Sequence, residues 1–207
     1  MNVGQIKAAV FRFGFNSSDP VVDWINEAQI QFWDQYDWPW IYTNLGTACS
    51  AGSNSIAQPS DMVVPTAMQI ADPGLLTGPF TYLPKDSRLT YIEDGWDSTT
   101  AALGRPTSWN YGEGSIYFDK AADLSYRVVL YYIKNPTILT SDANVPDLPV
   151  RYHYALIRGA AAIGLDAENQ EERANVQLQR YQDIIDRAKA RYLPQGTRFS
   201  TIRNVRD

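Results

Sequence analysis

The chain has 207 residues, a formal net charge of -5 and a sequence pI near 4.9. Its composition, 44% hydrophobic and 20% charged, excludes a wholly disordered chain. The acidic balance argues against sequence-independent binding of nucleic acid, which needs clustered Lys and Arg. The single cysteine, Cys49, excludes an internal disulfide framework. No apolar run approaches the roughly 20 residues of a membrane helix, so we expect a protein of a reducing, soluble setting.

The N-terminal segment predicts a short helix followed by a longer one. Residues Val3–Phe13 form a short amphipathic stretch, and Gly14 fits a helix stop. Asp19 is expected to cap the longer helix and Pro20 to occupy its first position. That helix ends near Asp37, because the following proline disfavours helix at the residue before it. Its apolar face is expected to contain Val21, Ile25, Ala28, Phe32 and Tyr36, flanked by Trp24 and Trp33.

Residues 148–192 predict two more helices, with a break near Gly164. In the second of them, apolar residues recur at alternating steps of four and three, which places them on one helix face. Such a face needs a partner in the fold, and the N-terminal helices offer one. We therefore expect residues 1–39 and 146–193 to form one discontinuous helical bundle. Its packing is expected to involve Trp24, Ile25, Ala28, Phe32, Leu156, Ala160, Leu178, Tyr181 and Ile185.

Residues 40–145 predict an inserted antiparallel β module that ends in a linker, so the fold class is α+β. Short apolar runs alternate there with Gly, Pro, Ser and Asn. The last run, Tyr126–Ile133, is β-branched and aromatic throughout, which favours a central strand covered on both faces. The strand order predicts a meander within a small sandwich or barrel. The other expected strands are Ile41–Ala48, Asp61–Ile70, Thr90–Ile92 and a hairpin over Ser108–Phe118 with a Gly-rich turn.

Residues 194–207 carry no helical pattern and predict an extended C-terminal arm. Arginines alternate there with apolar residues, a composition typical of segments that fold on a partner. The residues expected to dock are Arg198, Phe199, Ile202, Arg203, Val205 and Arg206.

The sequence carries no motif of catalysis, metal binding or cofactor binding. His153, the only histidine, is expected on a helix surface, and Cys49 is expected to be a buried or incidental thiol. Loop aspartates more often cap turns than form catalytic pairs. Trp96 and Trp109 could stack on a sugar or a base, but core or interface burial is the commoner fate. We therefore expect no enzyme, no cofactor and no metal.

A series of motifs in a fixed order nevertheless resembles a known family. The motifs are Trp24–Gln29, Asp37–Trp40, Ile56–Met62, Gly104–Trp109, Gly114–Phe118, Leu130–Pro136, Val145–Pro149 and Tyr152–Ile157. In this order they resemble the head-to-tail adaptor (connector) proteins of tailed bacteriophages, the group that includes tail tubular protein A of podoviruses. The resemblance covers nearly the whole chain up to Tyr192.

The resemblance implies a structural virion protein of the neck, made in the host bacterial cytoplasm. Such adaptors form a homo-oligomeric ring, usually a dodecamer, beneath the portal protein at the capsid vertex. The helical bundle would form the ring body, the β module would face a downstream tail or nozzle protein, and the arm would insert into the portal. DNA would pass through the lumen without specific binding, and no membrane would be involved.

Two other readings stay open. One is a different ring-forming neck protein, a stopper or tail-completion protein, which would not need the arm to bind the portal. The other is a carbohydrate-binding β module on a helical stalk, whose binding would depend on Trp96 or Trp109.

Overall fold

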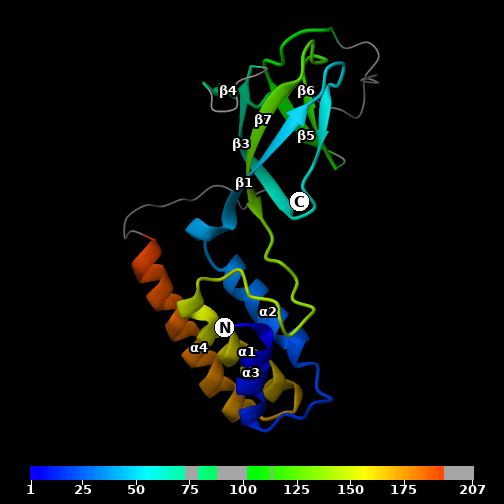
Figure 1. Cartoon of the computed structure of the whole chain (residues 1–207). Helices are drawn as coiled ribbons and strands as arrows, with labels where there is room; N and C mark the ends of the chain where they lie inside the picture. The colour runs from blue at the N-terminus through cyan, green and yellow to red at the C-terminus, as the bar shows by residue number, and fades with distance from the viewer. Residues whose placement is uncertain (73–78, 88–101, 113, 194–207) are drawn as a thin grey trace. The chain divides into compact units, whose positions relative to one another are not determined.

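The computed structural model describes residues 1–72, 79–87, 102–112 and 114–193 (Figure 1). The chain divides into two compact units, a helical one from Met1–Trp40 with Pro136–Asp207 and a β unit from Ile41–Asn135. Helices in one unit and antiparallel sheets in the other confirm the α+β class. The expected linker, residues 136–145, groups with the helices, whereas the sequence had suggested that it belongs with the β module.

In its described residues, the helical unit contains four α-helices: α1 (Val3–Val10), α2 (Val21–Asp34), α3 (His153–Ala167) and α4 (Glu171–Tyr192). Asn2 and Gln5 form a capping box at α1, and the short 3-10 turn after α1 ends at Gly14, whose φ of 112° suits glycine. The expected cap at Asp19 is wrong. No side chain caps α2, and the Asp19 carboxylate instead accepts the Asn16 N–H at 2.6 Å within the preceding turn.

Helix α3 packs against α1, α2 and α4 and is buried along most of its length. The expected break at Gly164 is wrong, because this residue lies inside α3. A Cβ atom there would lie 2.6 Å from the Trp24 ring and 2.7 Å from the Phe15 ring, so only glycine allows these rings to approach. The chain turns instead between α3 and α4, where Asn169 has a φ of 59°.

The linker, residues 136–145, is held on α2 by side-chain amides that form hydrogen bonds with its backbone, as a neighbouring strand would. Asn26 donates from Nδ2 to the Leu139 carbonyl at 2.9 Å and accepts the Leu139 N–H at 2.8 Å. Gln29 donates to the Thr137 carbonyl at 3.0 Å. These bonds satisfy linker backbone groups that no sheet reaches. They explain why this stretch belongs to the helical unit.

The described residues of the β unit form two antiparallel sheets, with strand orders β1-β7-β3-β4 and β2-β6-β5. The strands are β1 (Tyr42–Cys49), β2 (Ser55–Ala57), β3 (Met62–Ala71), β4 (Thr81–Leu83), β5 (Trp109–Gly112), β6 (Ser115–Phe118) and β7 (Tyr126–Lys134). The expected hairpin is confirmed as β5–β6, with Gly114 at a φ of 77°. The expected meander is wrong, because the last strand, β7, inserts between β1 and β3. The expected strand Thr90–Ile92 lies outside the described residues.

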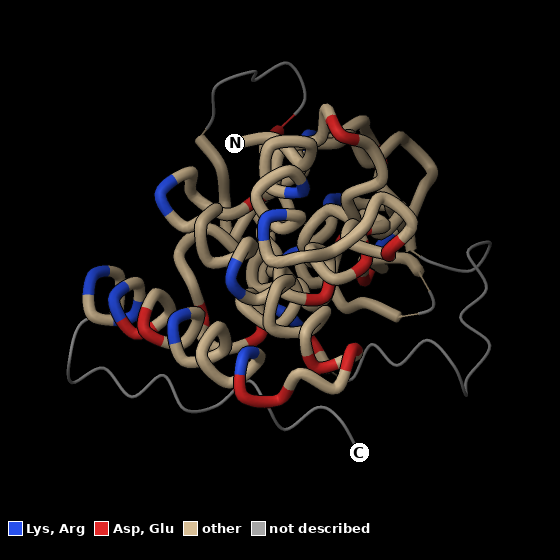
Figure 2. The backbone as a smooth tube through the Cα atoms, turned by 90° about the horizontal axis from the view of Figure 1, so that it is seen from below, with Lys and Arg blue, Asp and Glu red and all other residues tan. Residues whose placement is uncertain are grey.

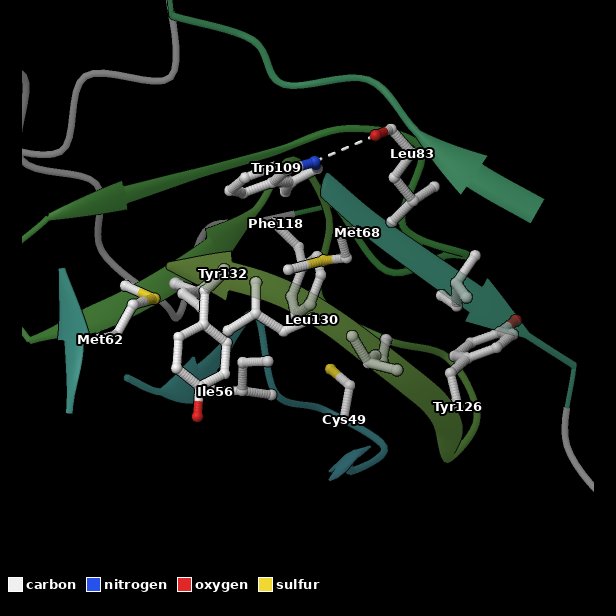
Figure 3. Packing of buried hydrophobic residues seen from close by; sticks show 14 residues of the cluster. Cys49, Ile56, Met62, Met68, Leu83, Trp109, Phe118, Tyr126, Leu130 and Tyr132 are labelled. Carbon is white, nitrogen blue, oxygen red and sulfur yellow. Dashed lines mark hydrogen bonds between the residues drawn. The ribbon is translucent and has the colours of Figure 1, made fainter. Parts of the chain in front are cut away.

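Strand β7 is central, as expected, but it is not covered equally on both faces. Its residues alternate between buried and more exposed, with Val128 and Leu130 fully buried and Arg127 exposed on the other face. The buried face joins side chains from both sheets in one hydrophobic core (Figure 3). Trp109 of β5 closes that core, and its indole N–H donates to the Leu83 carbonyl of β4 at 3.0 Å.

Candidate interaction surfaces

The residues with reactive side chains serve the fold. Cys49 is buried, and loss of solvent raises the pKa of its thiol to about 11, so it stays protonated. The expectation that His153 lies on a helix surface is wrong, because the ring is fully buried. Its Nε2 lies 2.8 Å from the Leu148 carbonyl oxygen, which requires the proton on that nitrogen, and its Nδ1 lies 3.0 Å from the Met1 amino group.

Three described loop carboxylates of the β unit, Asp61, Asp119 and Asp123, accept hydrogen bonds from neighbouring backbone and side-chain groups. Asp119 accepts the N–H groups of Thr107 and Ser108 at 2.7 and 3.0 Å. Burial raises the pKa of Asp119, but these hydrogen bonds outweigh it and hold the pKa below its ordinary value. Asp61 and Asp123 accept tyrosine hydroxyls from Tyr132 and Tyr126. These carboxylates therefore stabilise turns and strand ends.

A metal cluster, a membrane-spanning helix and an exposed ring at Trp109 are absent from the described parts of the chain. Within them, no three His, Cys, Asp or Glu side chains gather closely enough to hold a metal ion. None of the helices described is long and apolar enough to cross a bilayer. Trp109, one of two candidate sugar platforms, is buried in the β core and cannot stack on a ligand, while Trp96 lies outside the described residues.

Most residues expected to pack the bundle are buried in it. The buried ones are Ile25, Ala28, Phe32, Leu156, Ala160, Tyr181 and Ile185. Trp24 is half-buried and meets Phe15 edge-on at 4.9 Å. Leu178 is the exception, with 49% of its surface exposed. The buried face of α4 is centred nearer to Gln177, which accepts a hydrogen bond from Arg158 at 2.7 Å, so Leu178 falls outside the seam.

Five aromatic side chains hold the end of α4 to the rest of the helical unit. We call this group the end cluster: Phe32, Trp38, Trp40, Tyr152 and Tyr192. The two tryptophan rings stack at 4.9 Å, with 10° between their planes. Tyr192, in the last turn of α4, meets Trp40 edge-on at 5.1 Å and Tyr152 at 6.0 Å. The cluster therefore fixes the point from which residues 194–207 continue.

The end cluster was not predicted as a unit. The segment Asp37–Trp40 signals only a helix end in the sequence, and two ring partners of Trp40, Tyr152 and Tyr192, lie more than a hundred residues away. The density of aromatic residues at one helix end was the available signal. The six arm residues (Arg198, Phe199, Ile202, Arg203, Val205 and Arg206) lie outside the described residues.

Comparison with known proteins supplies the family. No curated protein sequence matches the chain. A family model described as "SU10 adaptor protein" matches residues 1–205, which is nearly the whole chain and includes both structural units. This match confirms the resemblance to head-to-tail adaptors, while the narrower likeness to tail tubular protein A stays a prediction. The chain belongs to the SU10 adaptor protein family, a family of bacteriophage head-to-tail adaptors.

Proposed function

We propose that this chain forms a closed ring between the portal vertex of the capsid and the tail, and that DNA passes through the ring. The family match over residues 1–205 is the observation that carries this proposal. Membership makes the chain a structural component of the virion neck that takes part in tail assembly. It also implies self-association and interaction with portal and tail proteins. The ring, its dodecameric copy number and the passage of DNA extend beyond that match.

In this proposal the helical unit forms the ring body and the arm at residues 194–207 docks on the portal. The end cluster supports this role, because it holds the last turn of α4 rigidly at the start of the arm. A segment that folds on its partner bears an entropic cost of ordering, and a fixed starting point reduces that cost. The β unit would then contact the next tail component.

The acidic balance suits a channel that DNA passes without being held. Binding to the phosphate backbone depends on Lys and Arg, and the chain has 18 of these against 23 Asp and Glu. The function needs no catalysis, because assembly alone accounts for the linking role of the family. The alternative stopper or tail-completion role shares the acidic balance but does not require the arm to contact the portal.

The test is a mass measurement on the purified chain mixed with the portal ring of its own phage. Mass photometry would compare the full chain with a version that ends at Pro194. Addition of a discrete multiple of the chain's mass by the full chain alone supports both the adaptor ring and the docking arm. If both versions add equal mass to the portal ring, the adaptor function is supported and the docking role of the arm is contradicted. Binding by neither contradicts the portal contact and favours the stopper role.

A further inference from the structure

Helix α2 presents one exposed face that carries only acidic charge. Asp23, Glu27 and Asp34 lie on this face, and Ile30, 39% exposed, lies among them. Steps of four, three and four residues place all of them in one row, opposite the buried residues of the helix. The helix contains no Lys or Arg along its whole length. We call this row the acidic face.

Helix α4 presents a mostly basic row along one edge, beside which the exposed Asp183 lies three residues after Arg180 and four before Arg187. Arg173, Arg180 and Arg187 recur every seven residues, which is close to two helical turns, and all three are exposed. Arg191 continues the row, and Val176, 47% exposed, lies between the first two arginines. We call this row the basic flank. Figure 2 marks the charged positions along the chain in blue and red.

The two rows lie on different sides of the helical unit. The edge of α4 that faces α2 is marked by Lys189, whose amino group donates to the Tyr36 hydroxyl at 3.1 Å. The basic flank lies on the other edge, where Arg173 donates to the Phe13 carbonyl at 2.8 Å. On that same edge Gln177 accepts from Arg158 of α3. The acidic face of one chain therefore does not meet its own basic flank.

We propose that the acidic face of α2 binds the basic flank of α4 on the next copy of the chain. The proposal rests on the proposed ring function and names the surfaces that build the ring. Two different patches on one protomer give a head-to-tail contact, the kind that closes into a ring, whereas a self-complementary patch gives a dimer. The acidic face spans roughly 16 Å from Asp23 to Asp34, and the basic flank spans roughly 27 Å from Arg173 to Arg191, so the shorter row fits along the longer one.

The charges in this contact decide orientation more than affinity. Exposed ion pairs contribute little individually and are screened by salt, but a row of them rejects wrong pairings. Contact of α2 with a second α2 would place carboxylates against carboxylates. Burial of Ile30 and Val176 would add apolar area to the contact. Such a contact is weak between two free chains and becomes stable when a portal ring holds many copies side by side.

Charge reversal tests the pairing on portal rings, in the mass measurement described above. Glu27→Arg places cation against cation, and Arg180→Glu places anion against anion, so each variant alone should load portal rings about tenfold less than the natural chain. An equal mixture of the two should restore loading, because each contact then joins opposite charges. Asp186→Arg is the matched control, since this exposed carboxylate of α4 lies off the basic flank. Full loading by either reversal alone, or no recovery in the mixture, would overturn the proposal.

Cross-linking tests the same contact without a portal. One variant carries Glu27→Cys and the other Arg180→Cys, both with Cys49→Ser, and a short bis-maleimide joins thiols that lie close together. Preferential cross-linking of the mixed pair, over either variant alone and over a pair with Asp186→Cys in place of Arg180→Cys, supports the contact. Equal cross-linking in all pairs contradicts it. If the natural chain does not bind the portal ring but the mixed cysteine pair still cross-links preferentially, the contact stands and the proposed function is contradicted.

Discussion

Gly159 of α3 lies so close to Ala28 of α2 that a Cβ atom on the glycine would be 2.7 Å from the alanine Cβ. The Tyr181 ring of α4 lies 3.1 Å from the same Cβ position. The Tyr181 hydroxyl donates to the Ala28 carbonyl at 2.8 Å, so helices α2, α3 and α4 meet at one place. The absence of a side chain at Gly159 is what allows this approach.

Replacing Gly159 by alanine should therefore destabilise the helical unit. Alanine gains up to about 1 kcal/mol in helix propensity, but overpacking of a fixed core costs about 1–3 kcal/mol. We expect a net loss of about 1 kcal/mol or more in the free energy of unfolding, measured with urea. Gly112→Ala is the control, because its added methyl meets no atom within 4 Å. Equal stability of the two variants would show that the helices shift apart at little cost.

The linker should detach from α2 when Asn26 is replaced by alanine. The change leaves the N–H and carbonyl of Leu139 without their partners, at a cost of about 1–3 kcal/mol in the free energy of unfolding. Hydrogen exchange at the Leu139 amide should accelerate at the same time. Gln31→Ala is a matched control on the same helix, because that amide binds only the exposed Glu27 carboxylate. If hydrogen exchange at the Leu139 amide is unchanged, Asn26 does not hold the linker on α2.

The buried His153 predicts a dependence of stability on pH. Burial lowers the pKa of this ring below its usual 6.5, although the hydrogen bond to the Leu148 carbonyl partly opposes the shift. The unfolded chain then binds a proton that the folded chain rejects, so the free energy of unfolding should fall as the pH drops below about 6.5. Urea titrations between about pH 7.5 and 5.5 would measure the slope. His153→Gln should flatten it, and an unchanged slope in that variant would assign the effect to other groups.

Removing the edge of the end cluster should loosen the last turn of α4. Tyr192→Ala deletes the contacts with Trp40 and Tyr152, each worth about 0.5–1.5 kcal/mol beyond burial. We expect faster hydrogen exchange in the last turn of α4, with the rest of the bundle unchanged. Tyr154→Ala, at a half-exposed tyrosine of α3, is the comparison. Similar exchange in the two variants would mean that the cluster does not hold the helix end.

Helix periodicity predicted the packing of α2 because this helix buries one continuous face. Ile25, Ala28 and Phe32 follow from spacing alone, since their positions along α2 determine where they point. The prediction that Leu178 packs in the bundle was wrong, because the apolar spacing of α4 fits two neighbouring helix faces. Only contact with the partner helices decides which of these faces is buried. The prediction of a break near Gly164 was wrong, because a glycine in a helical pattern indicates either a break or a close approach of another group. Here the groups that approach are the Phe15 and Trp24 rings, which are distant in sequence.

The β unit shows where sequence reasoning stops. Each strand of the β5–β6 hairpin is marked by its own residues and by a turn between them. The placement of β7 between β1 and β3 depends on pairings across the whole module, which no local pattern encodes. The charged residues of α4 indicate only a solvated helix face in the sequence, because any complementarity with α2 depends on where the two helices lie in the fold.

The pairing of β1 with β7 has a consequence for how this chain could have diversified. Tyr42, next to the start of the β unit, is paired with Ile133, next to its end. Paired residues of antiparallel strands lie about 5 Å apart, so the unit leaves the helical chain and returns to it at nearly one point. A short turn could span that gap. Exchange of the whole β unit for another would therefore require little change in the helical chain.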